Sequence, residues 1–277
     1  MITIDWIFSG GFEMAPNQEK VVNYYIGYKE EYRAEESRAA GLEFHYTKKI
    51  LSDYIMAESR VIELGCATGY YGLYFADKCM QYAGVDLSPD NIAIFHEKTA
   101  TEGIENVRAI VGDATALPEF SDCSFDVVLC LGPMYHLPRE ERLRVFDECY
   151  RIARSGAILA FAYINGLGAY VAACVHDEQR NMYPNAGANR NLFELNTDDQ
   201  LPGVFFFTSP EEMECDAKLK KFVIVKNCGV NFHFAACAIN AMSEEQFGCY
   251  MELADRMSAS PSCTGLSAHA LLICRKK

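Results

Sequence analysis

Short, almost continuously apolar runs recur along the first part of the chain, and each is followed by a segment with the spacing of an amphipathic helix. Apolar runs without polar alternation are typical of parallel strands that are buried on both faces. Their alternation with helices predicts a doubly wound, mostly parallel sheet of the α/β class. The runs lie at 61–64, 82–86, 107–111, 125–131 and 157–163, and two later runs at 221–225 and 268–274 extend the sheet to seven strands.

The first run leads into a loop with small residues at alternate positions. Glu63 ends the run, and Gly65, Cys66, Ala67 and Gly69 follow before the chain becomes helical again. Glycine permits positive φ angles and a close approach of the backbone to a ligand. The free amides and the positive dipole end of the next helix face such a loop. The loop therefore predicts a binding site for a nucleotide-like ligand.

The spacing of this loop separates two kinds of ligand. A dinucleotide fingerprint has a third glycine where this chain has Tyr70, and that glycine allows close packing of the helix. The carboxylate of Glu63 suits a ligand with an ammonium group and suits a pyrophosphate badly. The loop thus favours a nucleoside with a zwitterionic tail, which describes S-adenosylmethionine. A nicotinamide-dependent oxidoreductase is the less favoured alternative.

Acidic residues also end the second and third runs. Asp86 follows Glu63 by 23 residues, near the distance at which a nucleotide-binding fold presents a carboxylate to ribose hydroxyls. Ser88 is a plausible N-cap for the next helix, and Asp113 ends the third run. Because ligands of parallel sheets bind beyond the carboxyl ends of the strands, we expect these acids around one site. The structural alternatives are a solvated carboxylate at Glu63 and helix caps at Asp86 and Asp113.

The stretch ELGCATG at 63–69 resembles the first motif of the class I S-adenosylmethionine-dependent methyltransferases, an acid followed by glycines at alternate positions. Ala67 replaces the middle glycine, which requires an ordinary φ angle there. Patterns at 131–137 and 265–272 are similar to those of a group of bacterial small-molecule methyltransferases. The resemblance implies a Rossmann-like fold with an antiparallel final strand.

The same resemblance implies S-adenosylmethionine as the cofactor, and it places Asp113 and Ala114 at the adenine edge. It covers 21–163 and 205–277. The predicted cofactor-binding residues are Tyr25, Tyr28, Arg33, Glu63, Gly65, Cys66, Ala67, Gly69, Asp86, Leu87, Asn91, Asp113, Ala114 and Leu131.

The N-terminal segment carries tyrosines at helical spacing. Residues 21–55 are predicted to be helical, with Tyr25, Tyr28 and Tyr32 on one face. Packing of these rings against the sheet is one interpretation. The other is a lid, because aromatic rings can cover an adenosyl group and attract a sulfonium charge. We take a helical lid as the hypothesis for 1–55.

An insertion follows the fifth strand. Residues 168–182 can form a helix, and the turn-forming stretches at 183–191 and 196–200 follow it. Long irregular segments usually bind or cover something, so we interpret 164–207 as a substrate cap, with a surface excursion as the alternative. The expected parts of the chain are a lid at 1–55, a cofactor-binding core at 56–163, a cap at 164–207 and the end of the sheet at 208–277.

Composition restricts the functional classes. Half of the 277 residues are apolar, and the formal charge of −13 disfavours a nucleic-acid partner. No apolar run approaches the length of a membrane span, and the first residues lack a signal-peptide pattern. The 12 cysteines form no C-x-x-C pair, which argues for reduced thiols in a cytoplasmic protein and against a metal site. A small-molecule partner is expected, and nothing in the sequence indicates an oligomeric state.

The predicted reaction is direct transfer of a sulfonium methyl group to an oxygen, nitrogen or carbon atom. A general base is needed only where the acceptor loses a proton. His136 is the candidate base because it follows the fourth strand at the active edge, and holding its loop is its alternative role. Tyr135 and Tyr28 are weaker candidates, and His269 is expected to be structural. A catalytically silent nucleoside-binding module is the alternative to an enzyme.

Overall fold

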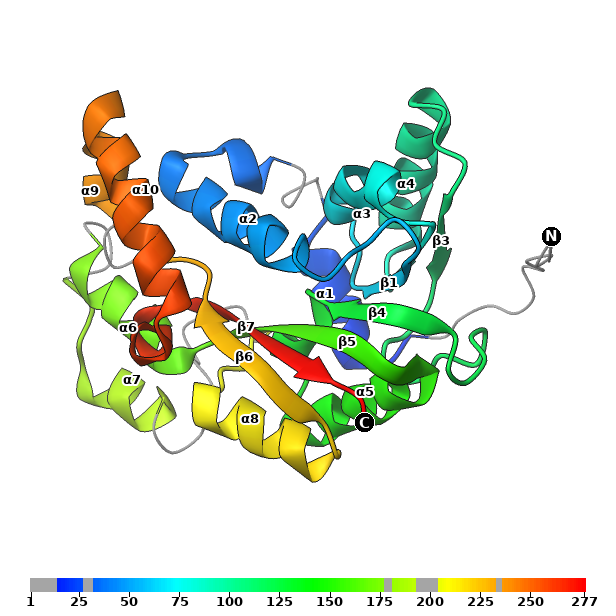
Figure 1. The fold of residues 1–277 in the computed structure, drawn as a ribbon. Helices are drawn as coiled ribbons and strands as arrows, with labels where there is room; N and C mark the ends of the chain where they lie inside the picture. The colour runs from blue at the N-terminus through cyan, green and yellow to red at the C-terminus, as the bar shows by residue number, and fades with distance from the viewer. Residues whose placement is uncertain (1–13, 27–31, 177–180, 193–203, 233–235) are drawn as a thin grey trace.

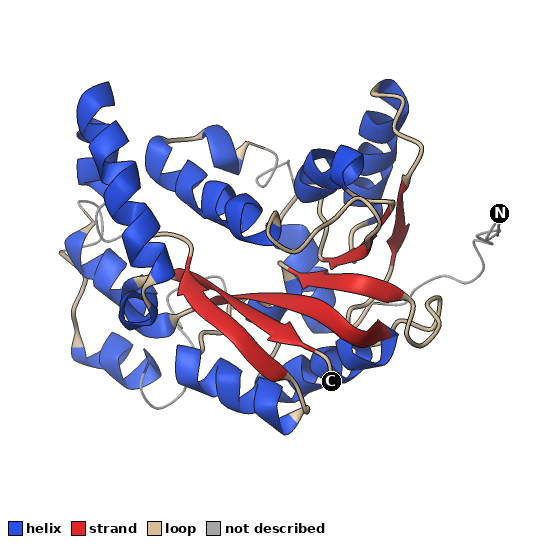
Figure 2. Cartoon of the chain, viewed as in Figure 1, coloured by secondary structure: helices blue, strands red, loops and turns tan. Residues whose placement is uncertain are grey.

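The computed structural model describes residues 14–26, 32–176, 181–192, 204–232 and 236–277. Its centre is a seven-stranded sheet with helices on both faces (Figures 1 and 2). The strands are β1 (Arg60–Leu64), β2 (Gln81–Asp86), β3 (Val107–Val111), β4 (Phe125–Cys130), β5 (Ala153–Ile164), β6 (Val223–Gly229) and β7 (His269–Arg275). Their order is β3-β2-β1-β4-β5-β7-β6, and β7 alone among them runs antiparallel to its neighbours β5 and β6. The α/β class, the seven strands and the antiparallel last strand are confirmed.

The strand order places a crevice in the middle of the sheet. From β1 the chain proceeds outward through β2 to β3, and it then returns to β4 on the other side of β1. The connections that follow β1 and β4 therefore diverge at this point. In open α/β sheets, ligands bind at such a switch point, outside the carboxyl ends of the strands.

Alternate residues of the central strands enter two separate cores. Val61 belongs to the core on the side of α2, α3, α4 and α10, whereas Ile62 belongs to the core on the side of α5 and α8. This period of two, with apolar residues on both faces, explains the continuous apolar runs in the sequence. The helices on these faces are α2 (Arg38–Leu51), α3 (Tyr70–Phe75), α4 (Pro89–Thr101), α5 (Arg139–Ile152), α8 (Pro210–Leu219) and α10 (Glu244–Ala259).

The N-terminal segment does not form the continuous helix predicted over 21–55. The helix α1 (Pro16–Tyr24) is followed by a 3-10 turn, η1 (Arg33–Glu35), before α2 begins. Ser37 has the extended backbone of an N-cap, and its hydroxyl accepts a hydrogen bond from the amide of Ala40. Tyr32 is 65% exposed, so it does not belong to a buried tyrosine face, and Tyr28 lies outside the described residues.

Among the described residues after β5, the short helices are α6 (Gly166–Val175) and α7 (Ala186–Arg190). The helix predicted at 168–182 ends at Val175, because His176 has an extended backbone. The stretch 196–200 lies outside the described residues, and the cap hypothesis stays a prediction. The strand predicted at 221–225 begins later, because Lys221 has a φ of 69° and cannot continue an extended strand. Four further short elements are η2 (Ala76–Lys78), η3 (Pro133–Tyr135), η6 (Pro261–Leu266) and α9 (Ala236–Ala241).

The loop after β1 has three residues in the left-handed region. The φ angles are 76° at Gly65, 44° at Ala67 and 90° at Gly69. The expectation of an ordinary φ at Ala67 is therefore wrong, and this conformation costs a residue with a Cβ about 1–2 kcal/mol. The amide of Ala67 donates a hydrogen bond to Asp86 Oδ2 at 2.9 Å, and this bond holds the strained turn.

Gly69 is required by packing as well as by its φ angle. It is the N-cap residue of α3, and an added Cβ would lie 2.2 Å from the ring of Phe95. At Gly103, where φ is 66°, an added Cβ would meet nothing within 4 Å. The two positions thus differ mainly in the space around them.

Gly69→Ala should lower the free energy of unfolding by about 2–4 kcal/mol, because a steric clash adds to the left-handed strain. Gly103→Ala introduces only the left-handed backbone strain, so its free energy of unfolding should fall by about 1–2 kcal/mol. Urea denaturation with an unchanged m-value measures both losses. Equal losses in the two variants would show that the contact with Phe95 has no energetic consequence.

Candidate functional site

A pocket lies at the carboxyl ends of β1, β2, β3 and β4, next to α1. It gathers the predicted cofactor residues except for two. Gly69 is buried beneath the loop and acts through the turn, and Tyr28 lies outside the described residues. The predicted residues that line it are Tyr25, Arg33, Glu63, Gly65, Cys66, Ala67, Asp86, Leu87, Asn91, Asp113, Ala114 and Leu131, together with His136. We call it the β1–β4 pocket.

Asp86 joins the loops that form this pocket. Its carboxylate accepts hydrogen bonds from the amides of Ala67 and Ser88, each at 2.9 Å, and from the side chain of Asn91 at 3.1 Å. Burial raises the pKa of Asp86, and these three donors oppose the rise. The hydroxyl of Ser88 accepts from the amide of Asn91, so the N-cap of α4 is Ser88 and not Asp86.

Glu63 is not the solvated carboxylate of the alternative interpretation. It is 1% exposed, and its Oε2 accepts a hydrogen bond from the hydroxyl of Tyr82 at 2.6 Å. Burial raises its pKa to about 8, against the lowering effect of Tyr82, and the charge of Asp86 adds to the rise. A neutral carboxyl group at the floor of a pocket becomes charged readily when a cation binds beside it.

His136 has partners at both ring nitrogens. Nδ1 donates a hydrogen bond to the carbonyl of Val204 at 2.7 Å, so Nε2 accepts from the hydroxyl of Tyr25 at 3.0 Å. Burial lowers the pKa of His136 to about 4, although the bond to Val204 opposes this. Because the folded-state pKa lies below the ordinary 6.5, the stability that neutral His136 contributes is full above pH 6.5. It is lost as the pH falls through the window down to about 4.

Helix α1 covers the β1–β4 pocket. Gln18 Nε2 donates to Asp113 Oδ2 at 2.7 Å, and Tyr25, at the end of the helix, contacts His136. The space left inside is about 150 Å³, below the 300–1,000 Å³ of ordinary small-molecule sites. We therefore expect a nucleoside-sized ligand to require a shift of α1 and release of Asp113 by Gln18, and the lid hypothesis for 1–55 stays a prediction.

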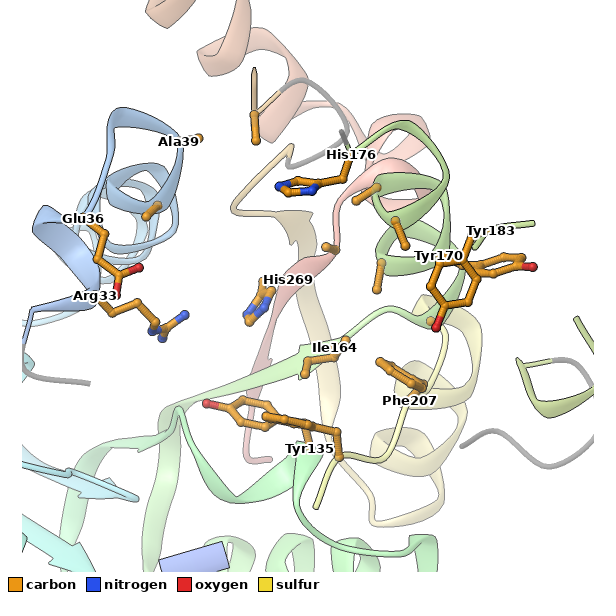
Figure 3. A pocket seen from close by; sticks show the side chains of 18 of the residues that line it. Arg33, Glu36, Ala39, Tyr135, Ile164, Tyr170, His176, Tyr183, Phe207 and His269 are labelled. Atoms are coloured by element: carbon orange, nitrogen blue, oxygen red, sulfur yellow. The ribbon is translucent and has the colours of Figure 1, made fainter. Parts of the chain in front are cut away.

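A second cavity, of about 840 Å³, adjoins the first. Figure 3 shows Arg33 and Glu36 on one side of it, Tyr170 and Tyr183 on the opposite side, and His269 between them. We call it the large cavity. Tyr25, Arg33 and Tyr135 line both the large cavity and the β1–β4 pocket, and they form the boundary between the two.

A charged cluster lies at this boundary. Glu43, on α2, accepts hydrogen bonds from both terminal nitrogens of Arg33, at 2.9 and 3.3 Å. Nδ1 of His269 lies 3.2 Å from the Oε2 atom of Glu43. Glu43 was not among the predicted site residues, and His269 was expected to be structural. No local motif connects a helix near the start of the chain with the beginning of the last strand.

Residues 61–156 match a protein family described as "Methyltransferase domain". This stretch contains β1 to β4, the loop with the acid and glycines, and the acids that line the β1–β4 pocket. The matched stretch is 96 of the chain's 277 residues. The class I methyltransferase family inferred from the motifs is thereby confirmed for the core of the chain.

Relatives with sequence similarity match over part of the chain only. The uncharacterized methyltransferase YcgJ of Bacillus subtilis is 34% identical over 80 residues, which is 29% of this chain and 31% of the relative. Ajmaline N-methyltransferase of Rauvolfia serpentina is 34% identical over 101 residues, 36% of this chain and 34% of the relative. The chain thus spans about a third of the length of these curated relatives.

Solved structures agree over most of the chain. The [4+2]-cyclase SpnF has a TM-score of 0.61 at 19% identity, covering 97% of this chain and 99% of that one. An S-adenosylmethionine-dependent methyltransferase of Mesorhizobium loti has a TM-score of 0.55 at 15% identity, covering 85% and 98%. Because the sequence identities to these two structures are only 19% and 15%, the structural similarity establishes the fold alone. Among the described residues, no helix is long and apolar enough to cross a membrane.

Tyr25→Phe should make α1 open more readily, because it keeps the ring but removes the hydroxyl that donates a hydrogen bond to His136. The loss of one hydrogen bond, about 0.5–1.5 kcal/mol, should accelerate amide exchange in α1 by about 2- to 10-fold. Hydrogen exchange measured by mass spectrometry tests this, with Tyr74→Phe on the exposed side of α3 as the control. Unchanged exchange in α1 would show that the Tyr25–His136 bond does not hold the helix.

Proposed function

We propose that this protein is an S-adenosylmethionine-dependent methyltransferase that acts on a small molecule. The observation that carries the proposal is the arrangement of the matched domain. Its loop with Glu63 and Gly65 lines the β1–β4 pocket, and that pocket shares a boundary with the large cavity. Transfer between two molecules requires two sites that hold the reactants against each other.

The chemistry of the residues that line the β1–β4 pocket supports this cofactor. An added Cβ at Gly65 would lie 2.7 Å from Pro133 Cδ, so the loop leaves a backbone cradle that only glycine permits. Asp86 and Asp113 supply carboxylate acceptors for the hydroxyl and amino protons of a nucleoside. The buried Glu63 would gain a favourable partner in the ammonium group of the methionine tail.

When bound, S-adenosylmethionine supplies a methyl group that its positive sulfur makes electrophilic. The chain's own task is to align the acceptor with that group and to exclude water, and such alignment is worth about 7–11 kcal/mol. Tyr25, Arg33 and Tyr135 line both sites and are therefore placed to define this alignment. Aromatic rings at the boundary also favour a positive charge near their faces.

A small molecule is the acceptor that the cavity and the charge favour. The large cavity has the volume of an ordinary small-molecule site. The net charge of −13 opposes binding to nucleic acid. All 12 cysteines are free thiols in the structure, which supports a reducing compartment such as the cytoplasm.

We assign His136 a positioning role and not the role of general base. Both of its ring nitrogens are engaged, by Val204 and Tyr25. Its pKa of about 4 makes it a weak base at neutral pH. His136 then fixes the loop after β4 and holds the end of α1 over the β1–β4 pocket.

A second function has a specific observation in its favour, because the similar structure SpnF is described as a [4+2]-cyclase. The fold therefore supports chemistry without methyl transfer, or a silent nucleoside-binding module. Cofactor binding does not separate these functions. The functions are separated by incubating the protein with methyl-labelled S-adenosylmethionine and a metabolite extract. A methyltransferase should produce S-adenosylhomocysteine and a new small molecule that carries the labelled methyl group.

Calorimetry should show binding of S-adenosylmethionine and no comparable binding of NAD or NADP. Near neutral pH, binding should release up to one proton, because an ammonium group lowers the pKa of Glu63 from about 8. The release is measured by repeating the titration in buffers of different ionisation enthalpy. It should fall close to zero in Glu63→Gln. Tight nicotinamide binding, or proton release that is unchanged in Glu63→Gln, would contradict the assignment of the pocket.

His136→Asn should change the rate of cofactor association more than the turnover at saturation. A base would give a loss of about 10²-fold or more, with an acid limb near pH 4, the pKa of the buried ring. We expect a loss in turnover below about 10-fold and no titration near pH 4. Stopped-flow association and the pH profile of turnover measure the two effects, and a 10²-fold loss with that acid limb would restore His136 as the base.

A further inference from the structure

We propose that His269, oriented by Glu43, is the general base that removes the proton of a phenolic hydroxyl in the large cavity. The inference rests on the proposed methyltransferase function and adds to it the acceptor class and the residue that activates the acceptor. His269 is the first residue of β7, and Glu43 lies within α2. The fold thus brings together two groups that are far apart in the sequence.

The geometry of the pair sets the tautomer of the histidine. Nδ1 of His269 lies 3.2 Å from Glu43 Oε2, and a carboxylate can only accept, so Nδ1 carries a proton. The neutral ring then has its lone pair at Nε2, on the opposite edge. His269 lines the large cavity, whereas Glu43 lines the β1–β4 pocket, so the pair spans the boundary where a methyl group would pass.

Glu43 places a negative charge beside His269. Glu43 is 9% exposed; burial raises its pKa, but the charge that His269 carries when protonated, the charge of Arg33 and the hydrogen bonds from both side chains outweigh this and hold the pKa well below its usual range. The carboxylate is therefore ionised and stabilises the positive ring that forms when His269 takes a proton. Among the described residues, Tyr135 also lies near His269, with ring centroids 6.3 Å apart, and the side-chain oxygen of Asn231 accepts a hydrogen bond from the His269 amide.

The walls of the large cavity indicate a flat, aromatic acceptor. Both aromatic rings and small side chains line it. Aromatic walls favour the face and edge contacts of another ring. The lining rings include Tyr24, Tyr135, Tyr170, Tyr183, Phe205 and Phe207, and the alanines include Ala39, Ala40, Ala169, Ala172, Ala173 and Ala268.

A general base accelerates methyl transfer where the acceptor must lose a proton, as a phenolic hydroxyl must. A neutral amine attacks with its own lone pair, whereas a phenol must become a phenolate to attack well. In the proposed step, the hydroxyl proton passes to Nε2 of His269, and an oxygen electron pair forms the bond to the methyl carbon. The carbon–sulfur bond breaks, its electrons remain on sulfur, and His269 then releases the proton to water.

The experiment uses 4-nitrophenol, whose phenolate absorbs visible light and whose neutral form does not. Calorimetry first establishes saturation with S-adenosylhomocysteine, which tests the cofactor site alone. 4-Nitrophenol is then added at mildly acidic pH. The wild-type protein should bind it and should raise the bound phenolate fraction above that in buffer. In His269→Gln the probe should still bind, with the phenolate signal reduced by about 10-fold or more and its methylation slowed by about 10²-fold.

Two variants separate this role from a structural one. His269→Asn leaves the Arg33–Glu43 ion pair in place and should behave like His269→Gln. His45→Gln changes an exposed histidine on the same helix as Glu43 and should keep the wild-type phenolate signal. Glu43→Gln, a test of the positioning residue, should reduce the signal while the probe still binds.

The possible failures are distinguishable. If S-adenosylhomocysteine does not bind, the proposed function fails. If it binds but 4-nitrophenol does not, the assignment of a phenolic acceptor is wrong. If the probe binds in its neutral form to the wild-type protein, or keeps its phenolate signal in both His269 variants, His269 is not the base.

Discussion

The close approach of the loops after β1 and β4 organises the rest of this structure. Gly65 lies against Gly132 and Pro133 so tightly that a Cβ would come within 2.7 Å of the proline ring. Asp86, at the end of β2, connects the loop after β2 to these two loops, because its carboxylate accepts a hydrogen bond from the amide of Ala67 at 2.9 Å. These contacts leave a cradle of backbone at the switch point of the sheet. They also set where His136 and the acidic residues of the β1–β4 pocket lie.

Around that cradle, the protein buries polar groups whose charge state depends on what binds. Glu63 lies at the floor with a raised pKa, and Glu43 at the boundary is held ionised by Arg33 and His269. The first arrangement favours a cation that arrives with a ligand, and the second favours proton uptake by a neighbour. Under the proposed function, these two arrangements serve the two sides of a transfer between bound molecules.

Much of the core was predictable from sequence because its signals are local. The loop with Gly65, the acids that end the strands and the N-cap at Ser88 depend on neighbours a few residues away, and each was placed correctly. The φ angle at Ala67 was predicted wrongly, because the hydrogen bond to Asp86 that holds this turn comes from the next strand. The contact of Glu43 with His269 has no local signal, since it depends on how α2 docks onto the end of the sheet.

The most direct test of the account is a crystal structure of the protein with S-adenosylhomocysteine. The ligand should lie in the β1–β4 pocket, with its nucleoside at Asp86 and Asp113 in place of Gln18. Its sulfur should lie at the boundary formed by Tyr25, Arg33 and Tyr135, open toward the large cavity. A ligand bound elsewhere, or a sulfur that faces away from this cavity, would contradict the proposal that the two sites serve one methyl transfer.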